Sequence, residues 1–215
     1  MTYQMQAFPG INLLGKPEKN GIYDRQEIIT LITQYYDLLA KIRYFAASYI
    51  KYAPHDHPID VELAKSYDLE LLQALPYIEG YRNEDEFVLG GGFADMRNLE
   101  VLMQSRDLGF ASPEGGFDDE NGEYMRPWEF CINECGNHGT MMFLGTRNGH
   151  ITMEGQDSGR SEDPGVYNYP GGLQSRNRNS HDHLPSRNAK EVFEYFTNRL
   201  LKLEWIPSSE DRRML

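Results

Sequence analysis

The sequence predicts an α+β fold with N-terminal helices, a central and mainly antiparallel sheet, and a closing C-terminal helix. Apolar residues recur at three- and four-residue spacing from Ile28 to Ile42, which is typical of an amphipathic helix. Three short apolar runs follow one another between residues 128 and 153, as in a sheet of sequential strands. A second helical pattern occupies 187–203, and the elements do not alternate as in βαβ folds.

The 215 residues are expected to form one structural domain. In this domain an N-terminal helical segment, residues 1–80, packs on a sheet-containing core, residues 81–215. A chain of this length buries about 70% of its unfolded surface. Its 14 Tyr, 10 Phe and 2 Trp supply large side chains for the core, so the fold needs no disulfide.

The first helix is expected to begin at Asp24, which forms a capping box with Glu27. Five glycines and prolines in the first 21 residues predict an extended lead-in before it. The apolar pattern becomes less regular beyond Ile42 and stops at Pro54. The helix is therefore either long or broken near Arg43.

Two shorter helices are expected next. Asp60 can cap a helix that ends near Tyr67, and residues 69–75 can form another before Pro76. No strand pattern is visible in the first 80 residues.

The middle of the chain changes character. Residues 86–89 predict a strand, and the glycine run 90–92 suits a bulge or a tight corner. Residues 98–104 favour a helical turn. The segment 108–122 is rich in glycine, proline and acidic residues and predicts a loop.

Three strands are then expected at 128–133, 140–144 and 150–153. An Asn-Gly step between the last two predicts a hairpin, so the strands form an antiparallel meander. The polar segment 155–187 is long for a connection, which indicates a functional or a mobile loop. Ser186 or Asn188 is expected to cap the closing helix.

The composition excludes several partners. The formal net charge of −12 repels phosphate backbones, so we expect no nucleic-acid partner. The chain has neither a run of 18 apolar residues nor a signal-peptide pattern at its start, so we expect no membrane partner and a cytoplasmic protein. Cys131 and Cys135 lie roughly 13 Å apart if both are on one strand, which predicts two free thiols.

A short segment of this sheet is similar to a known family. Residues 130–139 read Phe-Cys-Ile-Asn-Glu-Cys-Gly-Asn-His-Gly before an apolar strand, and Gly149-His150-Ile151 opens the next strand. This polar, glycine-containing turn between strands resembles the core of the SUKH superfamily, which includes fungal cell-wall-synthesis regulators and bacterial toxin-immunity proteins. The Leu75-Pro76 helix end, the glycine run 90–92 and the closing helix also fit the family pattern.

The resemblance to the SUKH superfamily implies an α+β fold around one mixed sheet and a protein-binding role without catalysis. The long first helix and the 155–187 insertion depart from the small family module.

Two His-Asp-His triplets hold four of the six histidines, namely His55-Asp56-His57 and His181-Asp182-His183. On a strand, two histidines spaced in this way present both rings on one face, as metal ligands do. Both triplets lie in proline-flanked loops, where an aspartate ordinarily satisfies backbone amides. We therefore expect no metal site, and the six residues remain candidates for acid and base catalysis.

Other motifs lack the partners that their chemistry needs. Cys131, Cys135 and His138 have no fourth zinc ligand at a recognisable spacing, and the acidic run 118–123 does not fit an EF-hand loop. The Gly-Gln-Asp-Ser-Gly run at 155–159 resembles a protease serine loop without a visible base or oxyanion hole. No cofactor is expected.

Four aromatic residues flank the loops at the margin of the predicted sheet and are candidate binding residues: Tyr124, Trp128, Tyr167 and Tyr169. Each can line a small-molecule pocket or anchor an interface. For Trp128 the simpler interpretation is packing in the core. For Tyr167 and Tyr169, which lie in the long loop, both interpretations remain open.

Two functional hypotheses follow. The first is a non-catalytic, SUKH-like protein-protein interaction module that recognises a protein partner through its acidic face and the 155–187 loop. The alternative is a small-molecule-modifying enzyme, an isomerase, cyclase or hydrolase, with a loop-roofed pocket in which the His-Asp-His residues act as acid and base. Proximity of the two triplets would favour the enzyme.

Overall fold

A computed structural model describes residues 23–57, 59, 68–81, 85–88, 90–105, 128–134, 139–155, 160–165 and 184–206. The elements in chain order are α1 (Arg25–Lys41), the 3₁₀ turn η1 (Ala47–Tyr49), β1 (Ile50–Lys51), α2 (Leu69–Ala74), β2 (Tyr77–Ile78), β3 (Glu86–Val88), β4 (Gly91–Gly92), α3 (Leu99–Gln104), β5 (Glu129–Cys131), β6 (Thr140–Gly145), β7 (His150–Gly155), β8 (Ser186–Asn188) and α4 (Ala189–Leu201). The predicted α+β class, with helices before and after an antiparallel sheet, is confirmed.

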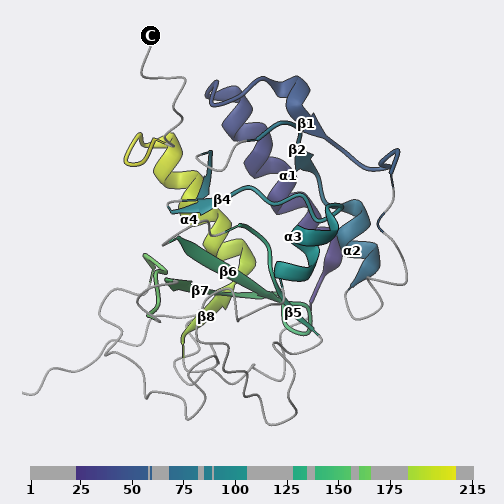
Figure 1. The fold of residues 1–215 in the computed structure, drawn as a ribbon. Helices are drawn as coiled ribbons and strands as arrows, with labels where there is room; N and C mark the ends of the chain where they lie inside the picture. The colour runs from purple at the N-terminus through teal and green to yellow at the C-terminus, as the bar shows by residue number, and fades with distance from the viewer. Residues whose placement is uncertain are drawn as a thin grey trace, which may run out of the picture.

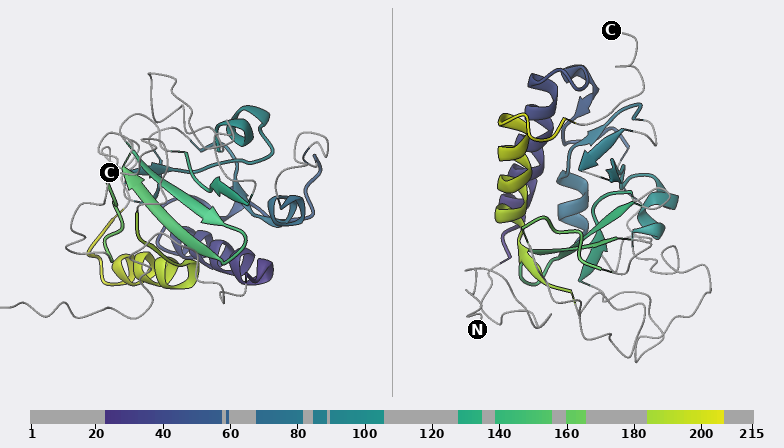
Figure 2. Two further views of the ribbon diagram at one scale, coloured as in Figure 1. Left: turned by 90° about the horizontal axis from the view of Figure 1, so that it is seen from below. Right: turned by 90° about the vertical axis from the view of Figure 1, so that its left-hand side faces the viewer.

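The helices α1 and α4 lie side by side and run in the same direction (Figures 1 and 2). They cover one face of a four-stranded antiparallel sheet with the order β5-β6-β7-β8. The described residues also form two small two-stranded sheets, β1-β2 and β3-β4. In Figure 1, β1, β2, α2 and α3 lie on the opposite side of the view from α4.

The predicted meander is confirmed as β5, β6 and β7, with Phe130 opposite Leu144 and Leu144 opposite Ile151. Burial alternates along β7, as expected for a strand with one face on the core. Sequence patterns missed β8, because its residues Ser-Arg-Asn carry no apolar alternation. This strand forms through its pairing with β7, and it takes its residues from the end of the predicted loop and the start of the predicted helix.

The start of α1 is confirmed at Asp24, whose Oδ1 accepts hydrogen bonds from the backbone N–H groups of Gln26 (2.9 Å) and Glu27 (3.3 Å). The helix ends at Lys41, so the shorter of the two predicted lengths is correct. The chain leaves the helix through Arg43, which has a φ of 63°.

Two backbone bonds close the end of α1. The N–H of Tyr44 donates to the carbonyl of Leu39 (2.9 Å), and that of Arg43 donates to the carbonyl of Ala40 (3.0 Å). This is a Schellman motif with arginine at the position that glycine usually occupies.

The expectation that the first 80 residues contain no strand is wrong. Residues Ile50 and Lys51 of β1 pair with Ile78 and Tyr77 of β2. Each strand has only two residues, which are too few to show an alternation. The strands pair across the 25 residues that separate Lys51 from Tyr77 rather than through a local turn. The helix expected at 60–67 lies outside the described residues.

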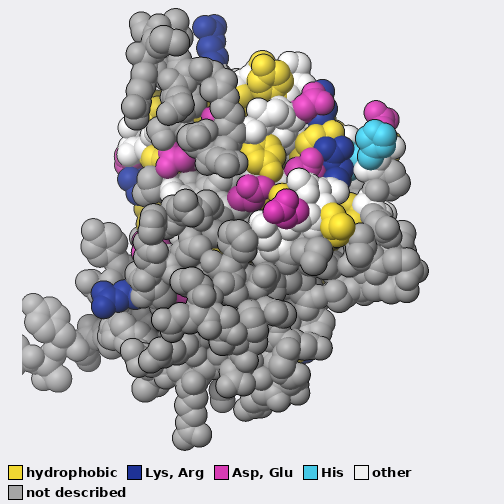
Figure 3. Space-filling model, in the orientation of Figure 1, with side chains coloured by type: hydrophobic (Ala, Val, Ile, Leu, Met, Phe, Trp, Pro, Cys, Tyr) yellow, Lys and Arg dark blue, Asp and Glu magenta, His cyan; other side chains and the backbone are white. Residues whose placement is uncertain are grey.

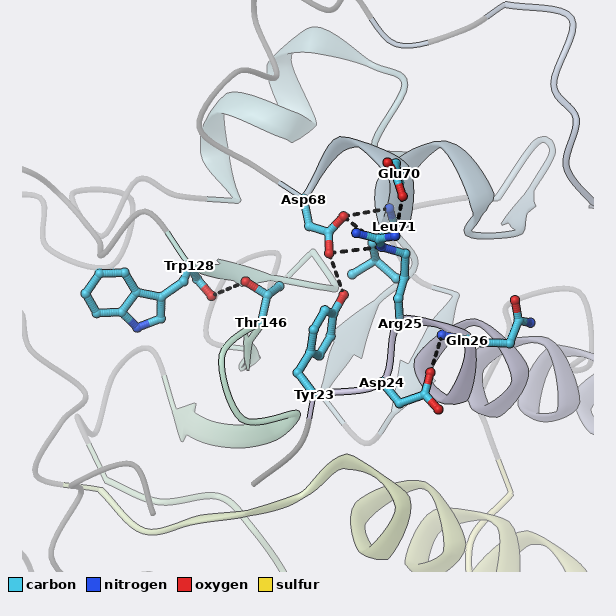
Figure 4. Close-up of polar contacts among 9 residues, drawn as sticks. All are labelled: Tyr23, Asp24, Arg25, Gln26, Asp68, Glu70, Leu71, Trp128 and Thr146. Carbon is cyan, nitrogen blue, oxygen red and sulfur yellow. Dashed lines mark hydrogen bonds and ion pairs between the residues drawn. The ribbon is translucent and has the colours of Figure 1, made fainter. Parts of the chain in front are cut away.

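A network around Asp68 connects the starts of α1 and α2 (Figure 4). Asp68 caps α2 by accepting from the N–H of Leu71 (3.0 Å). It also accepts from the Tyr23 hydroxyl (2.9 Å) and from Nε of Arg25 (3.0 Å), and Arg25 in turn pairs with Glu70. Burial and the neighbouring Asp68 raise the pKa of Tyr23 above its ordinary value, so the tyrosine stays a neutral donor.

The core joins side chains from α1, β3 and α4. The ring of Tyr35 packs edge to face on Phe87 (5.4 Å between centroids) and on Phe193 (5.7 Å), and its hydroxyl donates to the carbonyl of Phe87 (2.8 Å). Residues from before and after position 80 therefore share one buried cluster. No helix in the described part of the chain combines the length and apolar character that crossing a membrane requires.

Candidate functional site

The first His-Asp-His triplet does not form a catalytic arrangement among the described residues. Nε2 of His55 lies 2.9 Å from the carbonyl oxygen of Leu75, and its ring packs on Tyr77 with centroids 5.1 Å apart. Asp56 and His57 are exposed. The second triplet, His181, Asp182 and His183, lies outside the described residues.

Trp128 is half-buried and is not among the fully buried residues of the core cluster. The guanidinium of Arg147 stacks 3.2 Å above the centroid of its ring. Its carbonyl accepts from the hydroxyl of Thr146 at 3.0 Å (Figure 4). The same carbonyl accepts from the backbone N–H of Thr146 at 2.7 Å. Trp128 therefore packs at the rim of the β6-β7 hairpin. The other aromatic candidates, Tyr124, Tyr167 and Tyr169, lie outside the described residues.

The thiol of Cys131 is buried and is not part of a disulfide, and its Sγ lies 3.1 Å from the carbonyl oxygen of Asn133. Cys135, His138, the acidic run 118–123 and Ser158 lie outside the described residues. Within the described part of the chain, no three His, Cys, Asp or Glu side chains converge in a way that would hold a metal ion.

A cluster that the sequence reasoning missed gathers Tyr81 and three carboxylates, Asp95, Glu100 and Glu134. The Tyr81 hydroxyl donates to Oε1 of Glu134 at 2.6 Å. Asp95 and Glu100 lie close enough for their charges to act on Glu134. We call these four residues the tyrosine–carboxylate cluster. They are separated by up to 53 positions in the chain, so no local motif indicates the cluster.

The backbone around β4 and β5 places Glu134 in this cluster. Gly92 and Glu134 exchange two backbone hydrogen bonds, of 2.5 and 3.2 Å, in an isolated bridge. The neighbouring side chain of Asn133 donates to the carbonyl of Thr140 (2.8 Å) and accepts from the N–H of Met142 (2.8 Å). The predicted strand at 86–89 and the glycine run after it therefore form a small hairpin that is attached to the main sheet next to Glu134.

The electrostatics of the cluster are unfavourable for a carboxylate. Burial raises the pKa of Glu134 above its ordinary value, and the charges of Asp95 and Glu100 raise it further, whereas the hydrogen bond from Tyr81 acts in the opposite direction. Burial and the bond to Glu134 also raise the pKa of Tyr81. Neither Glu100 nor Glu134 forms an ion pair with another described residue.

The cluster belongs to a wider surface, which we call the acidic–aromatic face: Tyr77, Glu79, Tyr81, Asp95, Leu99, Glu100 and Glu134. Acidic and hydrophobic side chains alternate on this side of the described residues (Figure 3). Arg97 joins two parts of the face, because its guanidinium stacks 3.2 Å from the Tyr77 centroid and pairs with Asp95 (2.6 Å).

Lys51 pairs with Glu79 at 2.8 Å, so two of the four acids on the face are neutralised and two are not. Leu99 is 44% exposed. Beneath Tyr77 and Arg97 lies a small pocket with mainly apolar walls, and its described lining residues include neither His55 nor His57.

Replacing Glu134 with glutamine tests the electrostatics of the cluster. The raised pKa of Glu134 means that the folded protein holds a proton more tightly than the unfolded chain, so stability falls as the pH rises from the unfolded value of 4.5 through the folded one. Glu134→Gln removes this loss while its amide oxygen still accepts from Tyr81. We expect Tm at pH 7 to rise by roughly 1–2 °C, a modest gain because the group is half exposed and screened.

The gain should shrink as the pH is lowered towards 4.5, which thermal denaturation at several pH values measures. Glu194→Gln, on the exposed face of α4, serves as the control and should change Tm little at any pH. A Glu134→Gln protein that is less stable than the parent at pH 7 would show that the charged form is favoured.

No family model, curated protein or solved structure matches the chain. The resemblance to the SUKH superfamily therefore stays a prediction.

Proposed function

We propose that the chain is a non-catalytic protein-binding module that contacts a basic partner through the acidic–aromatic face. The observation that carries this proposal is the pair Glu100 and Glu134, whose charges no described residue neutralises although Asp95 lies nearby. Crowded carboxylates raise the free energy of the unbound chain. Lysine or arginine side chains of a partner would relieve this repulsion.

The composition of the face supports a protein partner. Tyr77 and Tyr81 are partly exposed, and tyrosine is among the residues that contribute most to binding energy at interfaces. The surrounding carboxylates and the net charge of −12 would speed the approach of a basic surface and reject acidic ones. The resemblance to the SUKH superfamily leads to the same expectation. The buried Cys131 is not part of a disulfide, which is compatible with a cytoplasmic location.

The enzyme hypothesis gains no support from the described residues. His55 is engaged with the carbonyl of Leu75, and His57 stands at the surface. A general base must lie within hydrogen-bond reach of a substrate in a pocket, and neither ring lines the small pocket below Tyr77.

Affinity capture from the cells that produce the protein tests the proposal. The immobilised parent chain is compared with a Glu100→Gln/Glu134→Gln variant and with a Glu191→Gln/Glu194→Gln variant, which removes the same number of charges from α4. We expect a stoichiometric protein that the parent and the α4 variant retain and that the face variant retains at least about ten-fold less, because two charge pairs at an interface contribute this much or more.

Retention should also weaken as the salt concentration rises. The proposal fails if the parent retains no stoichiometric protein, or if the face variant retains the same protein equally well.

A further inference from the structure

The C-terminal end of α4, residues 201–206, exposes an unusual amount of aliphatic surface. Leu201 is 62% exposed, Leu203 72% and Ile206 59%. Half of the large hydrophobic residues that are exposed in the described part of the chain lie in this one short segment. Single exposed leucines are ordinary, but several adjacent ones are typical of a contact surface.

The backbone of this segment adopts a conformation that its sequence disfavours. The N–H of Glu204 donates to the carbonyl of Arg199 (2.9 Å) and that of Leu203 to the carbonyl of Leu200 (3.0 Å), which makes a Schellman motif. Leu203 occupies the position of the motif that glycine prefers and has a φ of 56°. A residue with a β-carbon is strained there, so the fold alone would favour glycine.

A buried polar group in the same segment lacks a hydrogen-bond acceptor. Trp205 is 9% exposed and packs on Phe196, with ring centroids 5.9 Å apart. Its Nε1 is buried, and no acceptor among the described residues reaches it. A buried donor without an acceptor is unfavourable and uncommon in folded proteins.

The charges at this end point to the occupant of the surface. The chain carries −12 and repels a second copy over most of its surface. At the end of α4, in contrast, both signs of charge are present, because Lys202 and Glu204 alternate with the aliphatic residues. The Glu204 carboxylate lies 3.7 Å from Nε of Arg199 in its own copy and is still 52% exposed. A two-fold axis through this end would set Lys202 of each copy against Glu204 of the other.

We infer that two copies of the chain associate through residues 201–206. Leu201, Leu203 and Ile206 of one copy pack on the same residues of the other. The positive φ of Leu203 destabilises the isolated fold, but its exposed side chain then stabilises the dimer. This inference does not depend on the proposed function.

Sedimentation equilibrium of the full chain tests the inference. Three aliphatic side chains are fewer than a standard interface buries, so we expect a reversible dimer with a Kd of about 10–100 µM. Leu203→Glu should weaken the dimer at least about ten-fold by placing two carboxylates in an apolar contact. Leu99→Glu, at an exposed leucine on the acidic–aromatic face, is the control and should leave the Kd unchanged.

A second variant separates association from folding. Leu203→Gly relieves the backbone strain and should raise Tm by about 2–4 °C, yet it removes the most exposed aliphatic side chain and should weaken the dimer. In a Trp128→Phe background Trp205 is the remaining tryptophan, so its emission should change with protein concentration over the same range.

The inference is overturned by a parent chain that is monomeric at all concentrations, which would assign the surface to a different partner. It is equally overturned by a dimer that Leu99→Glu disrupts and Leu203→Glu does not. A Leu203→Gly protein that is more stable and dimerises as the parent does would also contradict it.

Discussion

Replacing Arg187 with alanine is expected to lower the free energy of unfolding by about 3–5 kcal/mol. Nε and Nη2 of Arg187 donate to the two carboxylate oxygens of Asp163 at 2.6 and 2.5 Å. The side chain of Asp163 is fully buried and that of Arg187 is 9% exposed. Removing the arginine therefore leaves a negative charge in the interior without a counter-charge.

The position of this pair enlarges the expected effect. Asp163 follows the short segment that pairs with the end of β7, and Arg187 lies in β8 opposite Ile151. Gly165 packs directly on the guanidinium, so the chain is closely fitted around it. The pair thus holds both ends of the segment between 163 and 187 against the sheet.

Denaturation by urea, followed by circular dichroism, measures the effect. Lys190→Ala is the matched control, since its pair with Glu194 spans 4.0 Å on the surface and contributes less than about 1 kcal/mol. An Asp163→Leu/Arg187→Met protein should recover most of the lost stability, because no charge is then buried. A loss of less than about 1 kcal/mol for Arg187→Ala would show that Asp163 is not isolated from water.

Replacing Asn133 with alanine is expected to cost about 2–4 kcal/mol of unfolding free energy. The Asn133 side chain is buried and satisfies the carbonyl of Thr140 and the N–H of Met142. Without it, both backbone groups stay buried and lose these bonds. The same change should loosen the bridge between Gly92 and Glu134 and hence the acidic–aromatic face.

Gly91 provides a partner for a double-mutant cycle with Asn133. A β-carbon at Gly91 would overlap Nδ2 of Asn133 and lie 3.0 Å from the carbonyl oxygen of Thr140. Val88 Cγ2 would also lie 3.0 Å from this β-carbon. Gly91→Ala should therefore destabilise the parent strongly and the Asn133→Ala protein less, because the closest of the three contacts is then absent. The contact with the carbonyl oxygen of Thr140 should still make Gly91→Ala destabilising in the Asn133→Ala protein.

Unfolding free energies of the four proteins give a coupling energy, which we expect to exceed about 1 kcal/mol. Gly80→Ala is the control at a glycine where a β-carbon meets no other atom within 4 Å, although its φ of 72° imposes backbone strain. It should show no coupling to Asn133. Additive effects of Gly91→Ala and Asn133→Ala would contradict the close packing between β4 and this side chain.

Elements with a local signal were predicted correctly. The apolar spacing of α1 and α4, the cap Asp24 and the Asn-Gly hairpin of the meander all act within a few positions of the chain. Of the two caps expected for the closing helix, Asn188 is correct and Ser186 belongs to β8. In contrast, β1, β2 and β8 have two or three residues each, and they become strands only because a partner distant in the chain supplies their hydrogen bonds.

The candidate site also depends on contacts between distant segments, which local motifs do not indicate. The sequence predicted a site at the His-Asp-His triplets and the loop aromatics, because histidine and aromatic residues that lie close together in the chain are typical of functional sites. Of these, His55 proved to bind a backbone carbonyl, and Trp128 stacks with Arg147. The residues of the tyrosine–carboxylate cluster belong to no local sequence motif. Nothing in the sequence around Tyr81 therefore indicates that its hydroxyl lies 2.6 Å from Oε1 of Glu134.

The amino-acid order alone therefore establishes the acidic charge, the α+β class and the position of the long helices and of the meander, because composition and short-range periodicity control these properties. The folded chain decides the pairing of the short strands, the burial of Asp163 with Arg187 and the assembly of the acidic–aromatic face. Those features depend on contacts between segments tens of residues apart, and such contacts form only after the entropy of closing the intervening chain is overcome by burial of the shared core.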